Sequence, residues 1–238
     1  MDFNIQYPET KAVIAISISL ISYYCYFYLT SSKRLNHYFV SRYPEALFHI
    51  KKILFNKIAG FTFFALIPGI IFSSVWHIDF NQFGVSINKI IENWYWVIGL
   101  PLLISLINYF SAKSPDMYYR YPQMRINNWT VHTFLLSAFG WAIYLIGYEF
   151  LFRGILLLSC VEAFGIWPAI AINVSIYSAI HLPNGMKETL GAIPFGLIAC
   201  LSMLTSGSIL IPIIMHISLS VSTEFFTIRY NPEMKFVN

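Results

Sequence analysis

Charged residues are scarce in this sequence: Asp, Glu, Lys and Arg make up only 11% of its 238 residues. A soluble domain normally carries about 25% charged residues. The low charge, the 57% hydrophobic content and a mean hydropathy of +0.62 therefore exclude an ordinary soluble protein. A helix needs about 20 apolar residues to cross a bilayer. We predict an all-α, polytopic membrane protein with about seven to eight transmembrane helices.

Cysteine is scarce as well, and the sequence lacks several common signatures. Cys25, Cys160 and Cys200 lie in apolar runs without a CxxC pair, which favours a packing role. No small-residue cleavage site follows the first apolar run, so we expect this helix to be retained rather than removed as a signal peptide. The net charge of +4 is spread over several loops, so we predict no nucleic-acid partner.

Seven apolar runs predict the transmembrane helices. They are 12–30, 58–76, 94–112, 129–159, 168–181, 189–205 and 208–226. Pro68 and Gly69 predict a kink in the second helix. The fourth run is longer than one bilayer crossing, which predicts a helix that is tilted, broken or projecting. A second crossing hidden in this run would make eight helices.

Lys and Arg residues concentrate in a few of the links, which predicts their side of the membrane. The predicted cytoplasmic segments are 31–57, 113–128, 182–188 and 227–238, and the predicted external ones are the N-terminus, 77–93, 160–165 and 206–207. Segment 31–57 forms either a helix on the membrane surface or a solvated loop. On this path Glu149 lies in the outer half of the membrane and His181 near its inner end. They converge only if the fourth helix starts late or breaks, or if the fifth extends past His181.

The fourth apolar run contains two charged residues, Glu149 and Arg153, within the stretch Tyr148–Gly154. A charge inside a membrane-spanning segment is costly and usually marks function. The two residues are four positions apart with the acid first, so they meet on one helix face. The alternative interpretation is a structural ion pair that makes a buried arginine tolerable.

Two histidines lie in other apolar helices. His181 follows Asn173 and Tyr177 on one helix face, and His216 precedes Ser220 and Glu224 on another. A carboxylate and a histidine can activate water, and a second histidine can donate to an oxyanion. The same groups could instead hold a metal ion or relay protons, although H-E-x-x-H is absent.

The order E-x-x-x-R-G, then Y-x-x-x-H, then a histidine within the last apolar helix resembles the CPBP family of intramembrane endopeptidases (CAAX proteases and bacteriocin-processing proteins). That family carries E-E-x-x-x-R, F-x-x-x-H and H-x-x-x-N on separate helices. The resemblance covers about 129–226. It implies that Glu149 matches the second glutamate of the first motif, Arg153 its arginine, Tyr177 the aromatic residue, and His181 and His216 the two histidines.

Two positions depart from the family pattern. Tyr148 replaces the first glutamate, which is usually assigned as catalytic, and Ser220 replaces the asparagine. Tyrosine, with an ordinary pKa near 10, is a poor general base. If the chain is an enzyme, Glu149 would therefore have to leave Arg153 to act as the base. The resemblance implies Glu149, His181 and His216 as catalytic residues, and Arg153, Tyr148, Tyr177 and Ser220 as supporting ones.

We predict a single membrane domain, in which 1–128 is a helical region without a recognised motif and 129–226 is the protease-like core. The predicted function is hydrolysis of a peptide bond in a membrane-associated substrate. The alternatives are an inactive pseudoprotease that binds or scaffolds a membrane protein, and a small transporter, which the lack of a repeat disfavours. The sequence identifies no cofactor, and a divalent metal on Glu149, His181 and His216 is left open as an alternative. The predicted partners are the lipid bilayer and a membrane-associated peptide or protein, in the inner membrane if the source is bacterial.

Overall fold

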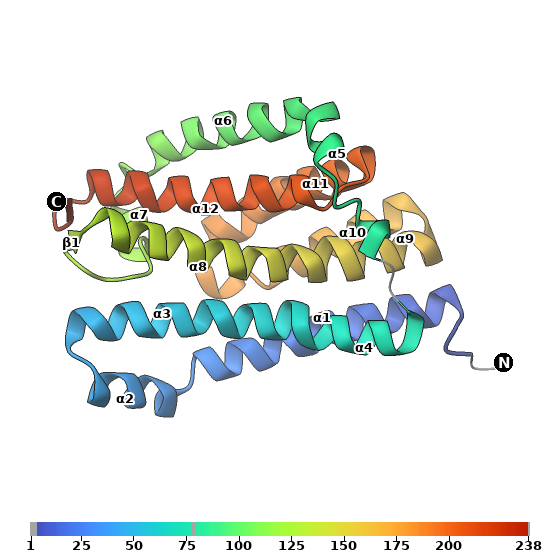
Figure 1. Ribbon diagram of the computed structural model, residues 1–238, viewed down its shortest axis with the longest axis horizontal. Helices are drawn as coiled ribbons and strands as arrows, with labels where there is room; N and C mark the ends of the chain where they lie inside the picture. Colours follow the sequence, from blue (N-terminus) through green and yellow to red (C-terminus); the bar gives the residue numbers. More distant parts are fainter. Residues whose placement is uncertain (1–3, 78–79, 238) are drawn as a thin grey trace.

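The computed structural model describes residues 4–77 and 80–237, and these form a bundle of helices (Figure 1). Residues 78–79 of the predicted external link lie outside the described part. In chain order the elements are α1 (Pro8–Thr30), α2 (Lys33–Arg42), α3 (Glu45–Phe61), η1 (Thr62–Leu66), α4 (Ile67–Trp76), η2 (Phe80–Phe83), α5 (Ile87–Glu92), α6 (Trp94–Ser111), α7 (Pro115–Arg120), β1 (Asn128–Trp129), α8 (Val131–Glu149), η3 (Phe150–Leu157), α9 (Leu158–Phe164), α10 (Ile166–Ala179), η4 (Leu182–Asn184), α11 (Met186–Ser206), α12 (Leu210–Tyr230) and β2 (Lys235–Phe236).

The all-α, polytopic fold class is confirmed. Six helical segments of the described chain are long and apolar enough to cross a membrane. They are Pro8–Thr30, Glu45–Trp76, Trp94–Ser111, Val131–Phe164, Met186–Ser206 and Leu210–Tyr230. The fifth predicted crossing corresponds to α10, which is apolar but shorter. The long fourth run is one continuous helical segment, so an eighth crossing is not hidden inside it.

The second helix begins earlier than predicted. Residues 31–57 contain α2 and most of α3, so the helical segment runs from Glu45 to Trp76 instead of starting at Ile58. Ser32 caps α2 by accepting from the backbone N–H of Leu35. The short helix α2 therefore ends before a separate long helix begins.

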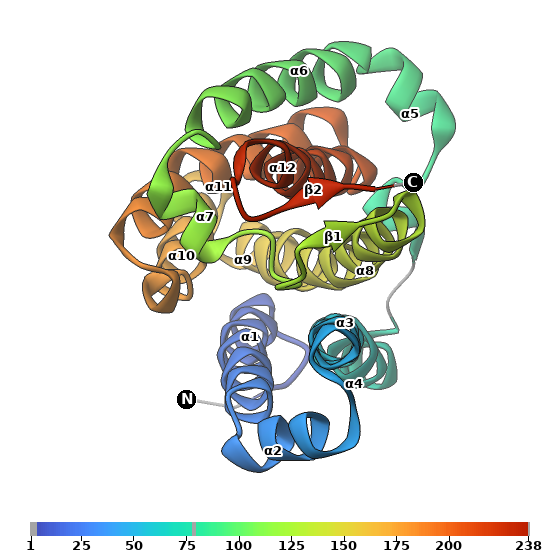
Figure 2. The same cartoon turned by 90° about the vertical axis from the view of Figure 1, so that its left-hand side faces the viewer.

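The helices are arranged in layers, which Figure 2 shows end-on. α1 and the α3–α4 segment form one layer and pack against α8 and α9. The middle layer contains α8 and α9, and α10, α11 and α12 lie beyond it. α6 forms the outermost layer and packs along α12. The segment from α8 to α9 is the most buried of the six long apolar segments, because helices pack on several sides of it.

The predicted cytoplasmic links lie together at one end of the bundle, the left-hand end of Figure 1. β1 pairs in parallel with β2 there, with Asn128 opposite Lys235. Arg120 donates to the carbonyl of Asn184 and forms an ion pair with Glu188. At the opposite end Lys89 donates to the carbonyl of Gly207 at 2.6 Å. The two sets of links are thus segregated, and which end faces the cytoplasm stays a prediction.

Two of the long helices contain a π-helical segment. η1 lies directly before Pro68 in the second crossing, and η3 covers Phe150–Leu157 within the fourth. π-Helical turns in α-helices occur frequently at functional sites. η3 begins one residue after Glu149 and contains Arg153, so the irregular backbone coincides with the predicted motif.

Gly165 forms the turn between α9 and α10 with φ of +82°, a conformation that suits glycine. The two helical segments therefore run back along each other from this turn. Glu149 lies 16 residues before Gly165, and His181 lies 16 residues after it. This equal spacing places both residues at a similar depth, so they converge without a break in the fourth helix or an extension of the fifth.

Candidate active site

A buried carboxylate connects two of the predicted site residues. Glu149 is fully buried, and its Oε1 lies 2.5 Å from Nδ1 of His216. Its Oε2 lies 3.2 Å from Nη1 of Arg153. Because a carboxylate can only accept, Nδ1 of His216 donates, which leaves Nε2 of the ring as an acceptor. Glu149 thus fixes the orientation and tautomer of His216.

Arg153 is held by more than its acidic partner. Its guanidinium carbon lies 4.4 Å from the ring centroid of Tyr177, within the range of a cation–π contact. Its Nη2 lies 3.5 Å from the carbonyl oxygen of Gly196. A side chain at Gly196 would crowd the Tyr177 ring, because a Cβ there would lie 3.0 Å from it. The ion pair is therefore enclosed by α10 and α11.

Asn173 stabilises the π-helical segment. Its Nδ2 donates to the carbonyl of Phe152 at 2.6 Å, and its Oδ1 accepts from the thiol of Cys200 at 3.3 Å. The sequence placed Asn173 on the same helix face as His181. The side chain is fully buried, and it binds the backbone of η3 next to Arg153.

His181 follows the end of α10 and keeps a defined tautomer. Its Nδ1 lies 2.7 Å from the carbonyl oxygen of Tyr177, so this nitrogen donates and Nε2 remains an acceptor. Burial lowers the pKa of His181 from 6.5 to about 4, which keeps the ring neutral near pH 7. In a neutral ring, therefore, Nε2 of either histidine is free to accept a hydrogen bond.

Tyr148 lies between the two histidines. Its ring centroid is 5.6 Å from that of His216 and 6.4 Å from that of His181. The side chain is 4% exposed, and its hydroxyl has no hydrogen-bond partner among the described residues. Such a buried, unpartnered group is uncommon in folded proteins and calls for an explanation.

These groups border a cavity of about 730 Å³. Tyr148, His181, His216 and Ser220 line it, and Glu149 lies behind His216 outside its wall. An apolar side is formed by Leu103, Ile107 and other residues of α6, and charged residues including Arg120 and Glu188 lie at one end. The cavity therefore combines an apolar wall with a small polar group of residues, as ligand sites commonly do.

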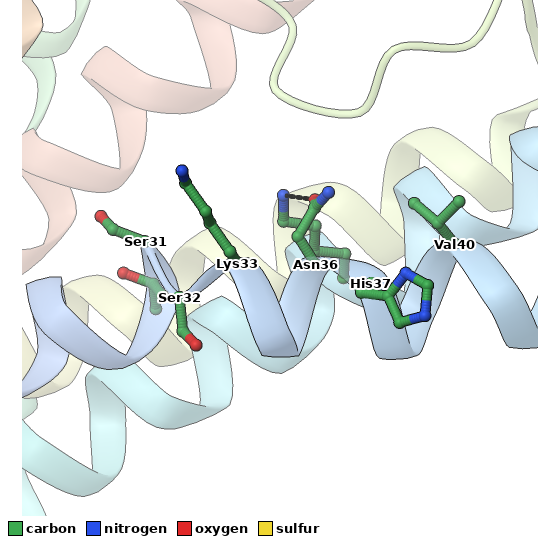
Figure 3. A pocket seen from close by; sticks show the side chains of 8 residues that line it. Ser31, Ser32, Lys33, Asn36, His37 and Val40 are labelled. Carbon is green, nitrogen blue, oxygen red and sulfur yellow. Dashed lines mark hydrogen bonds between the residues drawn. The ribbon is translucent and has the colours of Figure 1, made fainter.

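A second hollow lies at the junction of α1 and α2, with a volume of about 330 Å³ (Figure 3). Ser31, Lys33 and His37 border it, and Lys52 donates to Oδ1 of Asn36 across it at 2.6 Å. Its polar side chains are mostly exposed. None of the predicted site residues borders this hollow.

The alternative of a metal site can be tested on the side chains. Among residues 4–77 and 80–237, no three or more His, Cys, Asp or Glu residues are grouped as a metal-ion site. The two oxygens of Glu149 already contact His216 and Arg153. The carboxylate lies at Nδ1 of the His216 ring rather than at the free nitrogen Nε2. The predicted set of Glu149, His181 and His216 does not fit a resident metal.

Most of the predicted residues meet in one place. The structure brings together Tyr148, Glu149, Arg153, Tyr177, His181, His216 and Ser220. Glu224, predicted on the same helix face as His216, lies elsewhere: it accepts from Ser137 Oγ at 2.6 Å. Lys57 and Trp141 also line the cavity, and sequence reasoning missed both. A lysine near the end of a basic link gives no signal that it is buried.

A comparison with protein-family models found a match to this part of the chain. Residues 127–222 match the family model described as Type II CAAX prenyl endopeptidase Rce1-like. This segment, called the Rce1-like segment below, is similar to that family. The resemblance to CAAX proteases predicted from the motifs is thereby confirmed for this part of the chain. Comparisons with the curated proteins and with the solved structures found no match.

The Rce1-like segment comprises α8 to the greater part of α12 and contains every predicted site residue. Lys57 and the residues of α6 lie before it and complete the cavity wall. Together, the family match and the apolar helices identify an integral, multi-pass membrane protein. The site is therefore built by the Rce1-like segment and covered by the first half of the chain.

Proposed function

We propose that the protein is an intramembrane endopeptidase of the CAAX-protease type that hydrolyses a peptide bond in a membrane-associated substrate. The observation that supports this most directly is the hydrogen bond between Glu149 and His216 at the wall of a cavity that also contains His181. A carboxylate that orients a histidine strengthens it as a base, as in other hydrolytic sites.

His216 is the proposed general base. A water molecule donates to Nε2 of His216 and is held by Nε2 of His181. Its oxygen attacks the carbonyl carbon of the substrate as its proton moves to His216. Arg153 and Glu149 lie behind the ring, where the carboxylate stabilises the imidazolium that forms. Glu149 accordingly acts without leaving Arg153, by positioning His216.

The Tyr148 hydroxyl is the proposed donor to the negative oxygen that forms on the substrate. It is buried, belongs to a residue that lines the cavity, and has no partner among the described residues. Ser220 lies one helical turn after His216 and also borders the cavity. The imidazolium of His216 then gives its proton to the leaving nitrogen, the C–N bond breaks, and an acid and an amine are released. Tyr148 thus serves as a hydrogen-bond donor, a role that a neutral phenol can fill.

The second candidate is a pseudoprotease that binds a membrane protein without cleaving it. The replacement of the first family glutamate by Tyr148 supports this candidate, because no carboxylate of the motif borders the cavity. Under this proposal the same cavity binds a peptide and releases it intact.

A cleavage assay separates the two functions. Purified protein in detergent is incubated with a prenylated peptide ending in a CAAX sequence, and products are identified by mass spectrometry. The endopeptidase is supported if wild type cleaves and both His216→Gln and His181→Gln lose cleavage. Equal product in all three would overturn it. Binding of intact peptide without any product would support the pseudoprotease.

A further inference from the structure

Lys57 places an ammonium group inside the same cavity. The residue belongs to α3, is 4% exposed and borders the cavity beside Trp141 and Tyr144. Its Nζ lies 2.7 Å from the ring centroid of Trp141 and 4.8 Å from that of Tyr144. Gly140 packs against this side chain, and a Cβ there would lie 3.4 Å from Cγ of Lys57.

The ammonium group has no anionic partner in the described part of the chain. None of the ion pairs found there includes Lys57. The buried carboxylate of Glu224 is bound by Ser137 at 2.6 Å and by the backbone N–H of Gln123 at 3.4 Å. Contacts with aromatic rings alone do not compensate a lysine within a membrane protein for the hydration that it loses on burial.

A second donor beside Lys57 also lacks an acceptor. Nε1 of Trp141 is buried and has no hydrogen-bond partner among the described residues. Lysine and the indole N–H can only donate. Two donors without acceptors therefore meet at one place in the cavity wall, and a bound group rich in acceptor oxygens would satisfy both.

We propose that Lys57, together with Trp141, binds the terminal carboxylate of a peptide held in the cavity. This assignment rests on the proposed function for the identity of the peptide. A single carboxylate suits this place better than a phosphate, because the surrounding Trp141, Tyr144 and Ile107 are largely apolar. Neither Lys57 nor Trp141 takes part in breaking the bond.

The test measures binding separately from cleavage. His216→Gln removes the proposed base, so peptide stays intact during an anisotropy measurement in detergent with the full chain. A fluorescent prenylated CAAX peptide is compared with the same peptide carrying a C-terminal amide. The free acid is expected to bind at least tenfold more tightly than the amide. Equal binding of the free-acid and amide peptides would overturn the proposal. This comparison needs no substitution at Lys57.

Variants then assign the effect to Lys57. Lys57→Met is expected to abolish the preference for the free acid, and Lys57→Arg to retain part of it. Lys52→Met is the matched control, because Lys52 lies on the same helix outside the cavity and should keep the full preference. A full preference in Lys57→Met would overturn the assignment. A peptide with an amidated terminus and a carboxylate side chain distinguishes the terminal group from an acidic residue.

Two further outcomes separate this inference from its alternatives. If Lys57 only balances the charge of Glu224, Glu224→Gln would restore the thermal stability of Lys57→Met, and the acid and amide peptides would bind equally. If wild type never cleaves but the preference for the acid persists, the proposed hydrolysis fails and the carboxylate site stands. If the acid and amide peptides are instead cleaved with equal efficiency, the carboxylate site fails and the proposed hydrolysis stands.

Discussion

Glu149 and His216 are 67 residues apart in the chain, and Oε1 of the first lies 2.5 Å from Nδ1 of the second. The same carboxylate also pairs with Arg153. Glu149 is therefore positioned between a permanent cation and an imidazole that can become one. This arrangement resembles the carboxylate–histidine part of a hydrolytic triad more than a carboxylate that contacts water itself.

Replacing Glu149 with Gln tests this relationship. An amide cannot stabilise an imidazolium, and it can bind the wrong tautomer of His216. We expect the cleavage rate to fall by about 10²–10⁴-fold. The change also leaves the Arg153 charge buried without its partner, which costs about 3–5 kcal/mol of stability. Cleavage is measured by product formation and stability by thermal unfolding in detergent.

Glu162→Gln is the control for this variant. Glu162 pairs with Lys11 at the opposite end of α9, and its side chain is half exposed. An exposed pair contributes about 0–1 kcal/mol. The control should therefore keep its cleavage rate and nearly its full stability. A Glu149→Gln protein that cleaves normally would exclude Glu149 from the mechanism.

Tyr148→Phe removes one oxygen that has no partner in the described chain. Because no hydrogen bond is lost, we expect stability to stay the same or rise slightly without substrate. The loss of one oxyanion donor lowers kcat by about 10²–10³-fold, with little change in KM. Tyr23→Phe is the contrasting variant, since its hydroxyl donates to the carbonyl of Ile180 at 2.8 Å. Tyr23→Phe should lose stability, and its kcat should fall less than that of Tyr148→Phe. An unchanged kcat in Tyr148→Phe would remove Tyr148 from the proposed mechanism.

The low pKa of His181 predicts a specific pH dependence of stability. Burial holds that pKa at about 4, below the value of 6.5 expected for the unfolded chain. Between these values the unfolded state binds a proton that the folded state does not, so stability falls as pH decreases from about 6.5 to 4. The slope is about 1.4 kcal/mol per pH unit, and the total is on the order of 3 kcal/mol.

His181→Gln should therefore weaken this acid sensitivity. Unfolding is compared at pH 7 and pH 4.5 for the variant, the wild type and His37→Gln. His37 lies on the exposed side of α2, so its replacement should leave the wild-type dependence intact. An identical pH dependence in all three proteins would contradict the assignment to His181.

Much of the site could be predicted from the sequence because its residues carry their own signal. Glu149, Arg153 and His216 are conspicuous within apolar runs, since polar groups in a membrane segment are costly. Their convergence was harder to foresee. The equal spacing of Glu149 and His181 from Gly165 was present in the sequence, but it becomes informative only once Gly165 is recognised as the turn between antiparallel helices.

Other parts depend on packing that no local pattern encodes. The π-helical segment η3 is stabilised by Asn173 from another helix, so the sequence of Phe150–Leu157 alone does not indicate it. Lys57 lies after a run of basic residues and was read as part of a cytoplasmic link. Its burial results from the contact of α3 with α8, where Gly140 packs against the side chain.

The bond from Asn173 to the carbonyl of Phe152 supports a last prediction. Asn173→Leu keeps a similar volume and removes the donor, so the carbonyl in η3 loses its partner from α10. We expect a moderate loss of stability, about 1–3 kcal/mol. The larger effect should be on cleavage, because Arg153 belongs to η3 and any change to a regular α-helix would rotate it relative to Glu149. Asn108→Leu provides the comparison: Asn108 is also buried, but it joins α6 to α12 by donating to Leu219 O and Ser222 Oγ. If η3 serves to place Arg153, Asn173→Leu will lose cleavage well beyond its loss of stability, whereas Asn108→Leu will lose both in proportion. Equal behaviour of the two variants would mean that the irregular turn has no special role in the site.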